Sequence, residues 1–357
     1  MVKVVKYTAK DKMEGFDAMS TNEYKGKEAI IVVKRLSDFE DAFEYVEKLE
    51  QYSDIDKLVI DFSVLEYVKM LPVSLFAREL RQVVHWRKEH GVETYSRGHD
   101  VNKSVPLSYL SFIGFFDFIG LKDIGLKVRH EAEVTCVNPY LAITSYDYRR
   151  FKVNAEYDAF RREYDYISEE AVKISRLLTA SNDEKNSIMS YAIREIMRNA
   201  YEHSGTVNFY VMGQTWRDGS SELVIMDDGV GMLKSLKGKY PKLSTERDAI
   251  LAAMKPGVSG SDFGNNRYNN SGFGLYVLSE FAKMHGYICI ASGDCTIKAG
   301  EKIEERHVWN DGTLVALHLD SIPPDTQEEL SAIIKRGEVV SQQGEYPTKP
   351  SKETWNF

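Results

Sequence analysis

The order of strand-like and helix-like patterns changes near residue 145 and limits the folds open to this 357-residue chain. Before that point, short apolar runs alternate with amphipathic segments, which is typical of an α/β layer whose sheet is at least partly parallel. Beyond it, two long helical patterns precede a series of strand-like runs, which is typical of an α+β sandwich. We therefore expect domains at residues 1–145 and 150–320 and a polar, largely disordered tail at 321–357, with a short helical candidate at about 328–335.

The first domain is expected to alternate between strands and helices. The expected strands cover residues 29–33, 57–62 and 92–95, and the expected helices start near Ser37 and cover 73–89 and 104–121. Ser37 and Glu40 have the spacing of a capping box, in which each side chain satisfies a free amide at a helix start. Gly91 is a typical stop signal after the second helix.

The second domain combines long helical patterns with glycine-rich connections. Its expected helices cover about 155–179, 183–203 and 274–285, and its expected strands cover 207–213, 222–226, 287–291 and 313–319. Between residues 205 and 300 lie 14 of the 24 glycines, so flexible or strained loops should concentrate there. The long connection between Met232 and Asn270 is typical of a functional lid or of disorder.

Composition excludes several classes of protein. The 46 basic and 54 acidic residues give a formal net charge of −8, which argues against a nucleic-acid partner. The three cysteines, Cys136, Cys289 and Cys295, lack the spacing of a disulfide framework and indicate reduced thiols. The first residues lack the apolar core of a secretory signal, and the apolar stretch 107–121 is shorter than the roughly 18 residues of a membrane span. We expect a cytoplasmic protein without a membrane partner.

Glu195 and Asn199 form the first candidate functional pair. Their spacing of four residues on an expected helix puts both side chains on one face, about one turn apart. A carboxylate beside an amide oxygen suits the polarisation of a water molecule and the ligation of Mg²⁺. The same pair is common on exposed helix faces, so it decides nothing alone.

Asp227 stands at the end of an apolar strand and is followed by Gly229 and Gly231. The glycines let the backbone turn and approach a ligand closely. A carboxylate at this place can accept a hydrogen bond from an exocyclic amine such as that of adenine. An ordinary turn remains the alternative, because Asp-Gly is a strong turn signal.

The third segment, Gly272-Phe273-Gly274-Leu275, opens an expected helix. Unobstructed backbone amides at a helix N-terminus form an anion site that suits phosphates. Many helices begin after a flexible loop without binding anything. However, the three segments follow one another in a fixed order, each on the expected element, which favours a shared nucleotide site over coincidence.

Residues 150–320 resemble the GHKL, or Bergerat-fold, ATP-binding domain of gyrase, histidine kinases and anti-sigma-factor kinases. The motifs that carry the resemblance are Glu195-x-x-x-Asn199-Ala as the N box, Asp227-x-Gly229-x-Gly231 as the first glycine box, and Gly272-x-Gly274-Leu275 as the second. The expected fold of this domain is the two-layer Bergerat sandwich. The expected ligands are ATP and Mg²⁺.

The resemblance implies a role for each of these residues. Asn199 would ligate Mg²⁺, and Glu195 would be the catalytic base or would position the attacking water. Asp227 would hold the adenine amino group, while Gly272 and Gly274 would contact phosphates beneath a mobile lid. The further residues expected to bind the nucleotide are Gly229, Gly231, Ser271, Phe273, Leu275 and Thr313, the last of them near the adenine.

His203 follows Asn199 by four residues and is similar to the anti-sigma-kinase branch of the family, so we include it among the binding residues. A histidine packed near the end of a helix fits this position equally well. Glu202 stands where many histidine kinases carry a basic residue, and the histidine phosphoacceptor pattern is absent. A slowly hydrolysing Mg-ATPase and a serine/threonine kinase of the anti-sigma type therefore both remain open, as does ATP binding without hydrolysis.

Residues 27–130 resemble a STAS domain, the fold of anti-anti-sigma factors, on the strand-to-helix junction at 58–68. The following residues, 69–72, contain no serine or threonine at the expected phosphorylation site, and Ser74 lies a turn further on. A generic α/β partner-binding module is the alternative.

The combined resemblances imply a signalling or regulatory protein that binds a protein partner through its first domain. ATP occupancy would then control lid closure and contacts with the partner or with a second copy.

Overall fold

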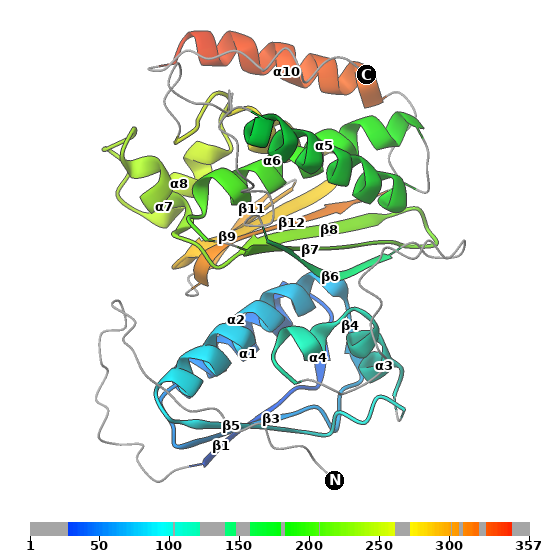
Figure 1. The fold of residues 1–357 in the computed structure, drawn as a ribbon, viewed down its shortest axis with the longest axis vertical. Coiled ribbons are helices and arrows are strands. Elements are labelled where there is room, and N and C mark those ends of the chain that lie inside the picture. The colour runs from blue at the N-terminus through cyan, green and yellow to red at the C-terminus, as the bar shows by residue number, and fades with distance from the viewer. Residues whose placement is uncertain are drawn as a thin grey trace. The chain divides into compact units, whose positions relative to one another are not determined.

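The computed structural model shows a mixed α/β protein with a large antiparallel sheet (Figure 1). The chain divides into two compact units, Met1–Arg129 and His130–Phe357. The structure describes residues 28–102, 104–121, 140–147, 158–179, 183–206, 208–260, 272–300, 302–306, 310–320 and 326–344.

The first unit contains a parallel sheet of three strands in the order β1 (Glu28–Val32), β3 (Lys57–Asp61) and β5 (Glu93–Arg97). Helices α1 (Phe39–Gln51) and α2 (Met70–Glu89) connect consecutive strands and pack against each other. Two short strands, β2 (Arg35–Leu36) and β4 (Tyr67–Val68), form a separate parallel pair. The expected alternation and the parallel pairing are confirmed.

The helices of the first unit differ from the expectation in three places. Helix α2 begins at Met70, three residues before the expected start at 73. Asp38 rather than Ser37 caps α1, because its side chain accepts the N–H of Asp41 at 3.0 Å. The expected helix at 104–121 is two helices, α3 (Val105–Phe112) and α4 (Phe115–Phe118). Gly114 separates them with a φ of +80°, a conformation that residues other than glycine rarely adopt.

The second unit is built on a seven-stranded sheet in which every neighbouring pair is antiparallel. In spatial order the strands are β11 (Ile303–Arg306), β10 (Cys295–Ala299), β9 (Gly286–Gly293), β12 (Asn310–Leu319), β8 (Ser221–Asp227), β7 (Asn208–Thr215) and β6 (Tyr140–Asp147). The helices are α5 (Asp158–Leu178), α6 (Asp183–His203), α7 (Gly231–Lys237), α8 (Glu246–Ala253), α9 (Gly274–His285) and α10 (Thr326–Gln342). Helices α5, α6 and α9 lie against one face of the sheet.

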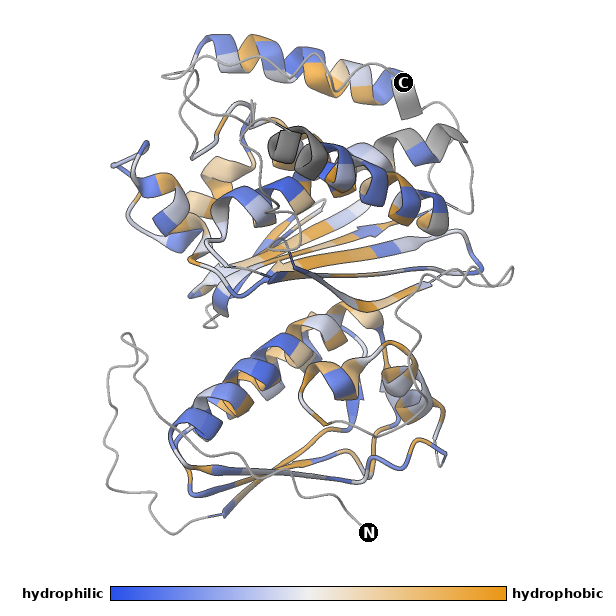
Figure 2. Cartoon of the chain, viewed as in Figure 1, coloured by the Kyte–Doolittle hydropathy of each residue, from blue (hydrophilic) through white to orange (hydrophobic). Residues whose placement is uncertain are grey.

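Alternate residues of the central strands form the core beneath these helices. Ile225 of β8 and Leu317 of β12 belong to the same buried cluster as Met197 of α6 and Val277 of α9. The hydrophobic colour of the central strands in Figure 2 agrees with their burial. The sandwich therefore rests on the period-2 pattern of its strands and the amphipathic faces of its helices.

The expected domain boundaries need two corrections. Strand β6 pairs with β7 in the sheet of the second unit, so residues 140–145 do not belong to the first domain. Helix α10 contacts α6 and α9, and Leu330 and Ile333 join the core cluster. The part of the expected tail that this helix covers is thus ordered, because it buries an apolar stripe. Residues 345–357 lie outside the described residues.

One buried cation joins the turn after α1 to β5 in the first unit. The Arg87 guanidinium donates hydrogen bonds to the carbonyl oxygens of Ser53 and Ile55, both at 2.7 Å, and to Thr94 Oγ1 at 2.8 Å. Burial lowers the pKa of Arg87 to about 10, so the side chain is still charged at neutral pH. These acceptors compensate for the water that the cation has lost.

We predict that Arg87→Met destabilises the chain by roughly 2–4 kcal/mol, because several buried carbonyl oxygens lose their donor. Urea denaturation of the full chain measures this free energy of unfolding. Lys88→Met is the control, since Lys88 is the exposed neighbour and should change stability by less than about 0.5 kcal/mol. Equal effects of the two substitutions would contradict the assigned role of Arg87.

His318 on β12 lies beside two carboxylates, those of Glu222 and Asp320. Its Nδ1 lies 3.3 Å from Glu222 Oε1, and its Nε2 lies 3.5 Å from Asp320 Oδ1. Burial lowers the pKa of His318, but the hydrogen bonds and negative charges of the two carboxylates outweigh it and raise the pKa overall. The folded state therefore binds this proton more tightly than the unfolded state does.

We predict that the free energy of unfolding decreases as the pH rises through the pKa of folded His318. The contribution is complete below the unfolded pKa of about 6.5 and is lost above the folded pKa. His318→Gln should remove this slope in denaturation series between pH 6 and 9. His85→Gln, at an exposed position of α2, should leave the slope in place. A slope that survives in His318→Gln would disprove the assignment.

Candidate functional site

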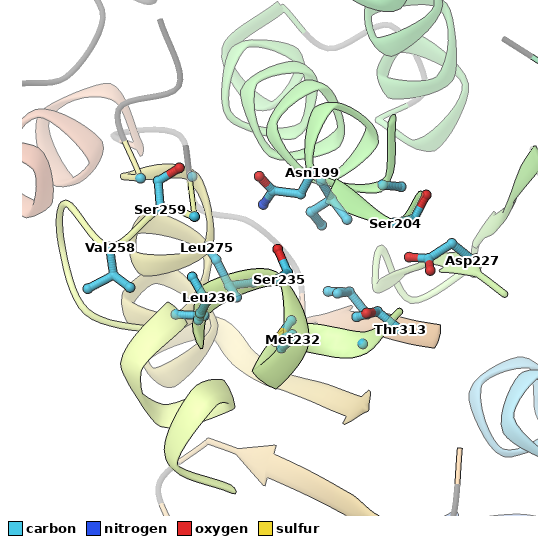
Figure 3. A pocket seen from close by; sticks show the side chains of 18 of the residues that line it. Asn199, Ser204, Asp227, Met232, Ser235, Leu236, Val258, Ser259, Leu275 and Thr313 are labelled. Carbon is cyan, nitrogen blue, oxygen red and sulfur yellow. The ribbon is translucent and has the colours of Figure 1, made fainter. Parts of the chain in front are cut away.

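One pocket of the second unit contains most of the residues expected in the site (Figure 3). Its volume is about 90 Å³, several times the roughly 10–15 Å³ that one water molecule requires on the same measure. The expected residues in its wall are Asn199, Asp227, Gly231, Gly272, Gly274, Leu275 and Thr313. They belong to four stretches that are distant in sequence, and the fold brings them together.

Asp227 lies at one edge of the pocket, where β8 ends. Its side chain is only 4% exposed, and Oδ1 accepts the N–H of Gly229 at 2.8 Å. Thr313 of β12 is the register partner of Asp227 and lines the same pocket. The buried carboxylate is thus fixed by its own turn and by the neighbouring strand.

Two glycines beside Asp227 are required by the close approach of three segments. A Cβ at Gly229 would lie 2.2 Å from the carbonyl oxygen of Ser204. A Cβ at Gly312 would lie 2.2 Å from the carbonyl oxygen of Asp227, and Gly312 has a φ of +75°. The end of α6, the turn after β8 and the start of β12 can therefore meet at Asp227 only without these side chains. Gly229 supports the pocket in this way rather than lining it.

Helix α6 supplies the opposite wall. Asn199 lines the pocket with Ile196 and Ala200, and Figure 3 shows its amide directed into the space between α6 and α7. Apolar side chains make up much of the remaining wall, among them Ile225, Met232, Leu236, Leu275 and Val315. Apolar walls with a few placed polar groups are the usual composition of a small-molecule pocket.

The start of α9 forms a third part of the wall. The carbonyl oxygen of Gly272 accepts the N–H of Gly257 at 3.0 Å, which joins the segment after α8 to the start of α9. Gly272 has a φ of +67°, and a Cβ there would lie 2.5 Å from the Val258 carbonyl oxygen. The first amides of this twelve-residue helix thus lie at the pocket, and the positive end of the helix dipole favours an anion there.

Glu195 lies behind the pocket wall rather than in it. Its side chain is 5% exposed, and a Cβ at Gly274 would lie 2.3 Å from Glu195 Cβ. Glu195 Oε1 is 3.5 Å from Arg194 Nε and 3.6 Å from Arg198 Nη1. Although Glu195 and Asn199 are one turn apart, Asn199 lines the cavity while Glu195 belongs to a buried cluster of charges.

The structure assigns Phe273 to packing and leaves two expected residues undescribed. Phe273 is fully buried and packs edge-to-face on Tyr276 with ring centroids 6.2 Å apart. His203 ends helix α6, but its side chain is outside the described part of the structure, and so is Ser271.

Sequence reasoning missed the contribution of the segment expected to be a lid. Part of it is helical, as α7 and α8, and Met232, Ser235 and Leu236 of α7 line the pocket. These residues have the spacing i, i+3, i+4 of a helix face, which was the available signal. Residues 261–269 of the expected lid lie outside the described residues.

Mg²⁺ prefers oxygen ligands, and the Asn199 amide oxygen belongs to the wall of this pocket. Within the described ranges, no group of three or more histidine, cysteine, aspartate and glutamate side chains could hold a metal ion. Mg²⁺ normally takes only one or two protein ligands and keeps water molecules and substrate phosphates. The Asn199 amide, in the same pocket as the N-terminus of α9, fits this pattern.

Comparison with known proteins finds no protein-family model and no curated protein that matches this chain. None of the helices in the described residues combines the length and apolar composition required to cross a membrane.

Proposed function

We propose that the second unit is a GHKL-type domain that binds ATP with Mg²⁺ in this pocket. The observation that carries the proposal is the convergence of Asn199, Asp227, Gly274 and Thr313 on one cavity. Each of these residues comes from a different element. An antiparallel sheet with helices on one face further supports the proposal.

The pocket offers a partner for each part of the nucleotide. The Asp227 carboxylate accepts a hydrogen bond from the adenine amino group, while Ile225 and Met232 supply apolar surface for the base. Asn199 holds Mg²⁺, which when bound neutralises charge on the phosphate oxygens. The backbone N–H groups at the start of α9, which Gly272 and Gly274 leave unobstructed because they carry no side chain, bind the phosphates of the nucleotide.

Slow hydrolysis is part of the proposal, with Glu195 as the residue that positions or deprotonates water. Its burial behind Gly274 and its two arginine neighbours support a low rate, because the carboxylate must reorient before it can reach a water molecule in the pocket. The alternative reaction is transfer of the γ-phosphoryl group to a protein serine or threonine. Measuring whether the phosphoryl group is released as phosphate or is attached to protein distinguishes hydrolysis from this transfer.

We propose that the first unit is a STAS-like module through which a cytoplasmic signalling protein contacts a protein partner. Its parallel sheet and connecting helices support an α/β partner module. Ser74 is fully buried and donates to the Leu71 carbonyl oxygen at 2.7 Å. Since this hydroxyl is closed to a kinase, the module acts by contact rather than by phosphorylation at the start of α2.

We predict that Asp227→Asn lowers the affinity for Mg-ATP by about 10- to 100-fold, because a charged acceptor for the adenine amino group is lost. Isothermal titration of the full chain measures the affinity. Asp228→Asn is the matched control and should bind as the wild type does, since Asp228 does not line the pocket. Chelation of Mg²⁺ should weaken ATP binding but leave adenosine binding unchanged. Unaltered Mg-ATP affinity in Asp227→Asn would refute the assigned pocket.

We predict that Glu195→Gln lowers phosphate release from ATP by at least about 100-fold while Mg-ATP affinity stays within about twofold, because base catalysis acts on the chemical step. Glu202→Gln is the control. Glu202 also pairs with Arg198, at 3.1 Å, but it follows Glu195 by seven residues on α6, which is about two turns. Equal turnover in Glu195→Gln and wild type would remove Glu195 from catalysis. Label from γ-labelled ATP on protein, rather than on free phosphate, would favour the kinase.

A further inference from the structure

Two side chains from other elements hold the first turn of α7. The N–H of Leu233 donates to Glu246 Oε2 at 3.0 Å, and the N–H of Met232 donates to Ser292 Oγ at 2.8 Å. The Ser292 hydroxyl in turn donates to Glu246 Oε2 at 3.0 Å. We refer to Glu246, Ser292 and the two amides as the α7 clasp, which joins the start of α8 and strand β9 to α7.

The backbone around the clasp leaves room for the Glu246 side chain. A Cβ at Gly293 would lie 2.3 Å from Glu246 Cγ, and one at Gly231 would lie 3.1 Å from both Glu246 Oε1 and Ser292 Oγ. Gly293 and Gly231 have φ values of +54° and +76°, so both positions also favour glycine conformationally. Two separate backbone turns are thus shaped around one carboxylate.

The clasp supplies what α7 lacks within its own sequence. The first amides of a helix have no intrahelical partner, and the N-cap residue Val230 offers no side-chain acceptor. The helix has only seven residues, far fewer than the roughly 12–15 at which an isolated helix becomes even marginally stable. Its position therefore depends on tertiary contacts.

This dependence matters because α7 carries a wall of the pocket. Met232, whose amide belongs to the clasp, lines the cavity together with Ser235 and Leu236 of the same helix (Figure 3). The clasp residues Glu246 and Ser292 do not themselves line this cavity. Glu246 therefore acts on a bound ligand through the position of α7, whereas Ser292 is also the register partner of the pocket residue Thr313.

We propose that Glu246 is a positioning residue for the nucleotide, which acts by holding α7 against the bound ligand. The inference rests on the proposed function of the pocket. Its neighbours on α8 do not share the role, because Arg247 pairs with Glu305 at 2.7 Å and Asp248 accepts from the Ser244 hydroxyl at 3.1 Å. Glu246 alone of these three connects α8 to α7.

The test compares Glu246→Ala and Glu246→Gln in the full chain by isothermal titration with Mg-ATP. Alanine should weaken binding by about 10-fold, the equivalent of one lost charged hydrogen bond. Glutamine should restore affinity to within about threefold. Its amide oxygen, in the place of Glu246 Oε2, can accept both from the Leu233 N–H and from the Ser292 hydroxyl. Asp248→Ala is the matched control on the same helix turn and should bind as the wild type does.

Hydrogen exchange at the Met232 and Leu233 amides provides a readout that needs no nucleotide. Exchange should be faster in Glu246→Ala and close to wild type in Glu246→Gln. Faster exchange with unchanged Mg-ATP affinity would overturn the proposal and leave the clasp a purely structural contact. Ser292→Ala, which should show the same two effects, keeps the test decisive if Glu246→Ala does not fold.

The same measurements separate this inference from the proposed function. If the wild type binds Mg-ATP and Glu246→Ala binds it equally well, the positioning role fails while the nucleotide site stands. An equal loss in Asp248→Ala would also overturn the role, because it would assign the effect to the general stability of α8. If the wild type does not bind Mg-ATP, the proposed function itself fails, whatever the exchange rates are.

Discussion

The pairing of β8 with β12 is the constraint on which the pocket depends. In this register Asp227 lies opposite Thr313, and Leu223 lies opposite Leu317. Every residue of β8 is buried, and a slip of one residue would turn all of its side chains to the opposite face of the sheet. The carboxylate at the end of β8 therefore has a position set by the core of the sandwich, not by a flexible loop.

Glu195 and Asn199 lie on the same face of α6, but the packing of α9 against that face leaves them in different surroundings. Glu195 and Asn199 are one turn apart on α6, yet only Asn199 reaches the pocket. The reason is Gly274, whose missing side chain lets α9 approach the stem of Glu195. Arg194 and Arg198, which are both buried, pair with the carboxylate. Helical periodicity gives the shared face, but only packing decides which part of that face opens to the cavity.

Features encoded by neighbouring residues were the predictable ones. Helix α9 covers the expected residues 274–285, and Asp227 ends its strand as the apolar run suggested. Strand β6 was missed because its partner β7 is more than 60 residues away. The clasp at Glu246 was missed for the same reason, since it joins three separated segments. The short helix expected at 328–335 is confirmed within the longer α10, but its packing on the core through Leu330, Ile333 and Ile334 does not follow from the polar residues around it.

The parts of the pocket wall are held by contacts of different kinds. The start of α9 rests on a packed core, in which the Tyr276 hydroxyl donates to the Ile333 carbonyl oxygen at 3.1 Å and Gly337 of α10 leaves room for the Phe273 ring. Helix α7, in contrast, depends at its first turn on a few polar contacts made by Glu246 and Ser292. A packed core has few alternative arrangements, whereas a contact held by a few hydrogen bonds can open locally. We therefore expect a ligand that bridges α7 and α9 to change the position of α7 more than that of α9.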